Sequence, residues 1–149
     1  MGTLQEQLKR AKTIQPNRLK NDLFKFVRSI EKEIIDLEKK RISEDSKDIF
    51  GKPIGFYSKA TDVITEGKKE WGTPFTGIDT GDWFKGFYMQ EVSGVLRFGS
   101  TDPKTNKILS SKHWLSDKLF GLSDKDLKEV ISSRLLPFFI ENSRKLIGI

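Results

Sequence analysis

Few residues of this chain have both the type and the spacing that catalysis requires. The sequence has no cysteine and a single histidine, His113, in the segment SSKHWL. Disulfide scaffolds, zinc ribbons and cysteine nucleophiles are therefore excluded, and so is a metal site built on paired imidazoles. No acidic residue stands at a diagnostic spacing from His113, so we interpret it as a structural or exposed histidine rather than a catalytic one.

Three carboxylates, Asp79, Asp82 and Asp102, could in principle gather around a divalent cation. The segment IDTGD, however, lacks the alternating oxygen ligands of a calcium loop, and no bidentate glutamate follows at the required distance. The glycines do not have phosphate-loop spacing, and no serine lies in a GxSxG elbow. We expect no enzymatic activity, no metal and no cofactor. A small magnesium-dependent nuclease built from scattered carboxylates remains an alternative.

The composition is that of one folded domain with an arm. The chain has 149 residues, of which 36% are hydrophobic and 32% charged, and its rings comprise 11 Phe, 3 Trp and 2 Tyr. That supply of rings is too rich for a disordered chain. No apolar run approaches the roughly 18 residues of a membrane span, and the first residues lack the apolar core of a secretory signal. We expect a protein made in the cytosol, with no membrane partner.

Basic residues are concentrated near the N-terminus. Residues 1–59 hold 14 Lys and Arg against 9 Asp and Glu, whereas residues 60–149 hold 13 against 12. We interpret residues 1–17 as an extended basic arm that could meet DNA phosphates or an acidic protein surface. The alternative is a solvated, partly disordered terminus. The basic residues assigned to this function are Lys9, Arg10, Lys12, Arg18 and Lys20.

The remaining chain, 18–149, is predicted to be a single α+β domain. Apolar residues recur every three or four positions over 18–42, which predicts a long amphipathic helix with Asn17 as its N-cap. Region 43–80 is rich in glycine and proline and is predicted to be a loop, yet it carries many aromatic rings. Such loops generally pack on their own domain or on a neighbouring subunit.

Strands are predicted in region 83–109 and helices in region 123–147. The segments 83–92 and 95–98 are expected to form a hairpin around Ser93-Gly94, with a possible third strand near 107–109. Ser123 is the predicted N-cap of the C-terminal helical region. Pro137 interrupts its apolar pattern, so the helix either kinks there or gives way to a second one. The predicted fold is a long helix packed on a small antiparallel sheet, followed by C-terminal helices.

Three segments, in order, resemble one family of proteins. They are 48–61 (DIFGKPIGFYSKAT), 79–84 (DTGDWF) followed by 95–102 (VLRFGSTD), and 119–127 (LFGLSDKDL). The order and spacing are similar to those of phage virion-morphogenesis and tail-completion proteins, including the Mu-type family and relatives in phages of Bacteroidetes. The resemblance covers residues 18–147. The chain departs from the family at Trp83, where leucine is usual, and at Asp117-Lys118, where the family often has arginine-proline.

The resemblance implies a structural role in a tailed phage. Such proteins form a neck or tail-completion ring between the head connector and the tail, so the expected partners are other copies of the chain, head-side connector or adaptor proteins and tail proteins, with passing contact to DNA. The expected location is the virion, after assembly in the host cytoplasm. Neighbours in such a ring make head-to-tail contacts that close by rotation. A sequence-nonspecific nucleic-acid-binding module is the alternative.

Aromatic residues are the candidate anchors of such contacts, because large rings dominate the energetics of protein interfaces. The alternative for each ring is that it fills the small core. The candidate anchors are Phe56, Tyr57, Trp71, Phe75, Trp83, Phe87, Tyr88 and Phe120.

Overall fold

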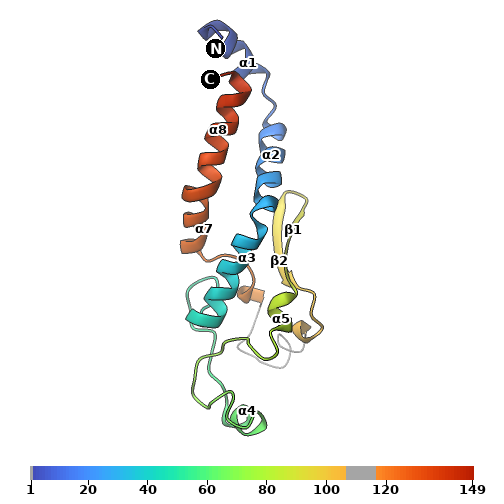
Figure 1. Ribbon diagram of the computed structural model, residues 1–149, viewed down its shortest axis with the longest axis vertical. Coiled ribbons are helices and arrows are strands. Elements are labelled where there is room, and N and C mark those ends of the chain that lie inside the picture. Colours follow the sequence, from blue (N-terminus) through green and yellow to red (C-terminus); the bar gives the residue numbers. More distant parts are fainter. Residues whose placement is uncertain (1, 107–116) are drawn as a thin grey trace. The chain divides into compact units, whose positions relative to one another are not determined.

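The computed structural model describes residues 2–106 and 117–149 and has an α+β fold, as predicted (Figure 1). Its described part combines helices with a two-stranded antiparallel sheet. The chain divides into two compact units. The first, here called the helical unit, comprises residues 1–32 and 125–149; the second, the mixed unit, comprises residues 33–124.

The predicted arm is helical rather than extended. Helix α1 (Leu4–Thr13) begins with a capping box, in which Thr3 Oγ1 accepts from the Glu6 amide and the Glu6 carboxylate accepts from the Thr3 amide. This reciprocal pairing satisfies two backbone donors that would otherwise be free at the helix start. The helix also packs against α8 (Leu136–Ile147) of the same unit. The prediction of an extended arm was therefore wrong for these residues.

The helix predicted over 18–42 is divided in two. Helix α2 (Pro16–Ser29) starts with Pro16 in its first turn and Gln15, not Asn17, as its N-cap. Proline is well tolerated there, because the first helical amides have no partner within the helix. The chain departs from helical geometry at Ile30, and α3 (Glu31–Lys40) follows, extended by a π-helical turn, η1 (Arg41–Asp45).

The C-terminal region is one helical path with a change of pitch. Helix α7 (Asp124–Val130) begins directly after Ser123, a π-helical turn η3 (Ile131–Leu135) follows, and α8 then runs to Ile147. Pro137 lies in the first turn of α8. The π-helical turn η3, which has i→i+5 hydrogen bonds, therefore ends just before the proline. The helical path continues past Pro137 instead of ending at it.

Aromatic stacking and a hydrogen bond join α2 to α8. The Phe26 and Phe138 rings lie parallel with their centroids 4.2 Å apart, and the Arg134 guanidinium lies 5.9 Å from the Phe26 centroid. One turn further along, the Asn142 side-chain amide donates to Asp22 Oδ2 at 3.0 Å. In Figure 1 these two helices run side by side.

The predicted hairpin turn is confirmed, but its first strand starts later than expected. Strands β1 (Phe87–Val92) and β2 (Val95–Ser100) pair in antiparallel register, and Val92 opposes Val95. Ser93 and Gly94 both have positive φ, 52° and 77°, as a type I′ turn requires. Trp83 is not in the strand; it lies in the short helix α5 (Asp82–Lys85). The third strand predicted near 107–109 lies outside the described residues.

Trp83 is at the centre of the aromatic core of the mixed unit. Its ring makes an edge-to-face contact with Phe87 at 4.9 Å and lies 5.3 Å from Phe84. Phe75 and Phe120 close the cluster at 6.5 and 6.1 Å. A Cβ on Gly77 would lie 2.6 Å from the Trp83 ring, and Gly77 has a φ of +71°. Both the close approach and the backbone conformation therefore require glycine there.

A buried arginine fixes the segment before α7. Arg41 donates to the carbonyl oxygens of Leu119 and Gly121 and, at 3.0 Å, to that of Lys47. The Gly121 amide donates to Glu38 Oε1 at 2.9 Å, and Gly121 has a positive φ of 114°. Burial raises the pKa of Glu38 to about 7, although the Gly121 amide and the Arg41 charge oppose the increase.

Candidate functional site

The most distinctive surface feature of the mixed unit is a long loop that is closed at its base. Three backbone hydrogen bonds join residues 55–57 to residues 72–75: Phe75 to Gly55 at 2.9 Å, Tyr57 to Thr73 at 2.9 Å and Gly72 to Tyr57 at 3.0 Å. We call these two segments the stem and the intervening residues 58–71 the tip. In Figure 1 the tip, with helix α4 (Lys59–Ile64), projects from the mixed unit at the end away from the β1–β2 turn.

The tip is ordered by polar contacts. Ser58 caps α4 by accepting from the Thr61 amide at 3.2 Å. The Asp62 carboxylate accepts from the Trp71 amide at 2.9 Å, and the Asp62 carbonyl accepts from the Gly67 amide at 3.0 Å. These bonds fix the backbone on both sides of the tip without using its large apolar side chains.

Those apolar side chains are exposed instead. Ile64 is 81% exposed, Val63 72% and Trp71 63%, and Phe56 in the stem is also largely exposed. The Trp71 ring has one cation–π neighbour among the described residues, the Lys59 ammonium at 5.9 Å from its centroid. An ordered loop that keeps several large apolar side chains in solvent is typical of a protein–protein contact surface.

The eight predicted anchors separate into three groups. Phe75, Trp83 and Phe87 are buried in the core, which for these three favours the alternative that the ring fills the core. Tyr57 and Phe120 are half-buried, and their rings contact Phe75 and the Trp83 cluster. The rings that remain exposed are those of Phe56, Trp71 and Tyr88.

Other apolar residues of the mixed unit are exposed but were not predicted as site residues from the sequence. Val63 and Ile64 in the tip were not singled out, and neither was Phe50, which is 64% exposed in the turn that Asp48 caps. Aromatic content pointed to the right region, 43–80, but an aliphatic pair such as Val63-Ile64 carries no sequence signal that separates an exposed from a buried position.

All five basic residues assigned to the arm are exposed, and they lie on α1 and α2. The positive charge belongs to the helical unit as a whole. That unit has 13 Lys and Arg against 6 Asp and Glu, a net +7, whereas the mixed unit has 14 against 15, a net −1. The surface that could attract polyanions is therefore in the helical unit.

Each of the three candidate carboxylates has a partner within the fold, and that of Asp102 is the Lys104 backbone amide, which donates to Asp102 Oδ1 at 2.8 Å. Asp79 lies 4.0 Å from the Lys69 ammonium and 3.9 Å from that of Lys104. The Thr80 hydroxyl donates to Asp82 at 2.8 Å and lowers the pKa of that carboxyl, with a smaller effect from Lys85. Within residues 2–106 and 117–149, no three His, Asp or Glu side chains are grouped as a metal site. His113 lies outside the described residues.

In the part of the chain that the structure describes, no helix is long and apolar enough to cross a membrane. Comparison with protein-family models, with curated proteins and with solved structures found no match to this chain. The resemblance to phage tail-completion proteins therefore rests on the three sequence segments described above.

Proposed function

We propose that the protein is a structural subunit of a tailed-phage virion, part of a neck or tail-completion ring that joins the head connector to the tail. The exposed apolar tip is the observation that carries this proposal. Its backbone is fixed by hydrogen bonds, while Val63, Ile64 and Trp71 are left for another molecule to cover. The three family-like segments supply the phage context.

The proposed occupant of the tip surface is the next copy of the chain in the ring. Head-to-tail contacts use two different surfaces of one subunit, so a projecting tip on one copy can meet a separate surface on its neighbour. The large apolar side chains supply binding energy, and the polar residues around them fix the register. In this function the chain holds neighbouring subunits together in a fixed arrangement and carries out no chemical step.

Electron microscopy of particles from a phage that lacks this gene tests the proposal. We expect filled heads separated from tails, or tails of unregulated length, with normal particles restored when the gene is supplied in trans. Intact virions with normal tails in the deletion would contradict a neck or tail-completion role.

A second candidate, sequence-nonspecific nucleic-acid binding, is favoured by the charge of the helical unit. A net +7 over 57 residues (32 plus 25) can attract phosphates, and Lys9, Arg10 and Lys12 are exposed on α1. Binding of this kind weakens steeply with salt. A fluorescence titration with duplex DNA at several salt concentrations distinguishes it, since a module that acts through phosphate contacts loses affinity log-linearly with salt.

A further inference from the structure

The C-terminal helical path carries apolar side chains on more than the side that packs on α2. Phe138 and Asn142, four positions apart, both contact α2. None of the residues of α8 is buried, and four apolar side chains of the path 124–147 are each 41–49% exposed. These are Leu127, Ile131, Leu136 and Ile140. A surface helix normally turns such residues toward a core, so this row is available to another molecule.

The four exposed residues form one continuous row, which we call the ridge. The steps from Leu127 to Ile131 and from Leu136 to Ile140 are four positions each, about one turn of an α-helix. The step from Ile131 to Leu136 is five positions, which in a regular α-helix would carry Leu136 to another side. That step spans the π-helical turn η3, in which the Leu136 amide donates to the Ile131 carbonyl. The wider turn takes up the extra residue and keeps the ridge continuous.

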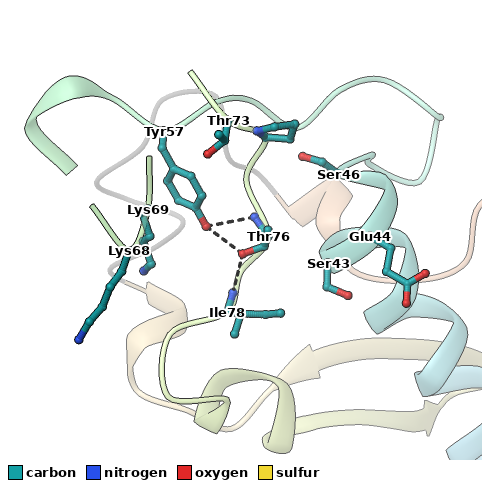
Figure 2. Close-up of a pocket in the computed structure, with 10 residues that line it drawn as sticks. Ser43, Glu44, Ser46, Tyr57, Lys68, Lys69, Thr73, Thr76 and Ile78 are labelled. Carbon is teal, nitrogen blue, oxygen red and sulfur yellow. Dashed lines mark hydrogen bonds between the residues drawn. The ribbon is translucent and has the colours of Figure 1, made fainter. Parts of the chain in front are cut away.

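The tip of the mixed unit is a second exposed apolar surface, and its base is rigid. Tyr57 lies in the stem, where its Oη accepts from the Thr76 amide at 3.1 Å, and Thr76 Oγ1 accepts from the Ile78 amide at 3.3 Å (Figure 2). These bonds add to the three backbone bonds that close the stem. The tip can therefore bind another surface with little further loss of backbone entropy.

Charge decides which surface of a neighbouring copy can cover the ridge. Packing of ridge on ridge would bring together two helical units, each with a net charge of +7, and their repulsion opposes that contact. The tip, residues 58–71, has three lysines and three acidic residues and is neutral, and it belongs to the mixed unit, with a net charge of −1. The tip can therefore approach the ridge without this repulsion.

We propose that the tip of one copy packs on the ridge of the next copy, with Val63, Ile64 and Trp71 covering the exposed apolar row. Each copy then offers one tip and accepts one, so the contact is head-to-tail and repeats from copy to copy, as a ring requires. This inference rests on the proposed ring and adds the surface that receives the tip.

Thiol cross-linking in purified particles tests the contact. The chain has no cysteine, so every thiol in it is an introduced one. Two differently tagged chains, Ile64→Cys in the tip and Leu136→Cys in the ridge, are produced with the wild-type chain during infection, and the particles are treated with a short bis-maleimide. We expect a mixed-tag dimer from this pair. The control pair is Phe50→Cys with Leu136→Cys, because Phe50 is exposed outside the tip, and it should give no dimer above background.

Three results would overturn the contact while leaving the ring in place. The first is the lack of a mixed-tag dimer in particles that contain both chains. The second is a dimer of two Leu136→Cys chains, which would mean that ridge packs on ridge. The third is a cross-linked monomer of the double variant Ile64→Cys, Leu136→Cys, which would mean that the tip covers the ridge of its own copy. Absence of the chain from the particles would overturn the ring and the contact together.

A charged substitution in the ridge provides a second, independent measurement. Leu136→Asp places a carboxylate where we expect the apolar tip, so its incorporation in competition with the wild-type chain should fall to less than about a tenth. Ser133→Asp is the matched control, since it adds the same charge at an exposed position of the same π-helical turn but outside the ridge. Both positions are exposed, so the melting temperature of the purified chain should change little in either variant. Equal incorporation of the two variants would overturn the ridge as the receiving surface.

Discussion

Replacing Trp71 with alanine should weaken copy-to-copy association while leaving the fold intact. A tryptophan can bury up to about 250 Å², and this ring is 63% exposed, so a neighbour could cover about 150 Å². At about 25 cal/mol per Å², the substitution should remove about 2–4 kcal/mol of association free energy per interface, if the neighbour covers at least half of that exposed area. That corresponds to a roughly 30- to 1,000-fold weaker contact.

The fold should tolerate this change. The Trp71 ring is mostly exposed and has one cation–π contact among the described residues, with Lys59, and the Trp71 amide that donates to Asp62 is unaffected by the substitution. We expect the free energy of unfolding to change by less than about 1 kcal/mol. Phe50→Ala is the matched control, because Phe50 is 64% exposed but lies outside the tip.

Competition for incorporation into virions measures the effect. Tagged Trp71→Ala protein is produced with the wild-type chain during infection, and the ratio in purified particles is read by mass spectrometry. We expect the variant at less than about a tenth of the wild-type level, and Phe50→Ala at parity. Equal incorporation of a folded Trp71→Ala protein would refute the role of the tip.

Three further predictions concern the buried groups around Gly121. Burial raises the pKa of Glu38 to about 7 from 4.5, so the folded state holds a proton that the unfolded state releases. The free energy of unfolding should therefore fall by about 3 kcal/mol as the pH rises through that window, and urea titrations of Glu38→Gln should lack the fall. Arg41→Met removes the donor to three carbonyls and should lower the free energy of unfolding, measured with urea, by about 3–5 kcal/mol. A decrease of less than about 1 kcal/mol would contradict the conclusion that Arg41 fixes the segment before α7. Gly121→Ala forces a side chain to a φ of 114° and should lower stability by about 1–3 kcal/mol by calorimetry; an unchanged melting temperature would refute the strain.

The parts of the fold that depend on local sequence were predictable. The apolar periodicity located α2, α3 and the C-terminal helices, and Ser93-Gly94 located a turn in which both residues have positive φ, a conformation that few other residue pairs adopt. Trp83 was placed in a strand because it adjoins a ring-rich segment. Gly81, with a φ of 86°, instead starts the short helix α5, which ends at Lys85 before β1 begins.

The parts of the candidate sites that depend on tertiary structure were not predictable. Trp71 and Trp83 are the same residue type in similar glycine-rich surroundings, yet one is exposed and the other 3% exposed. Glu38 and Arg41 have the spacing of an ordinary surface pair, and their burial depends on a segment about 80 positions away.

Cryo-electron microscopy of the neck and tail of the phage that encodes this chain is the most direct test of the proposed function. We expect density for a closed ring of this chain between the head connector and the tail, with residues 58–71 of each copy against its neighbour and Trp71 covered. Absence of the chain from the particle, or a ring in which the tip faces solvent in every copy, would contradict the proposal.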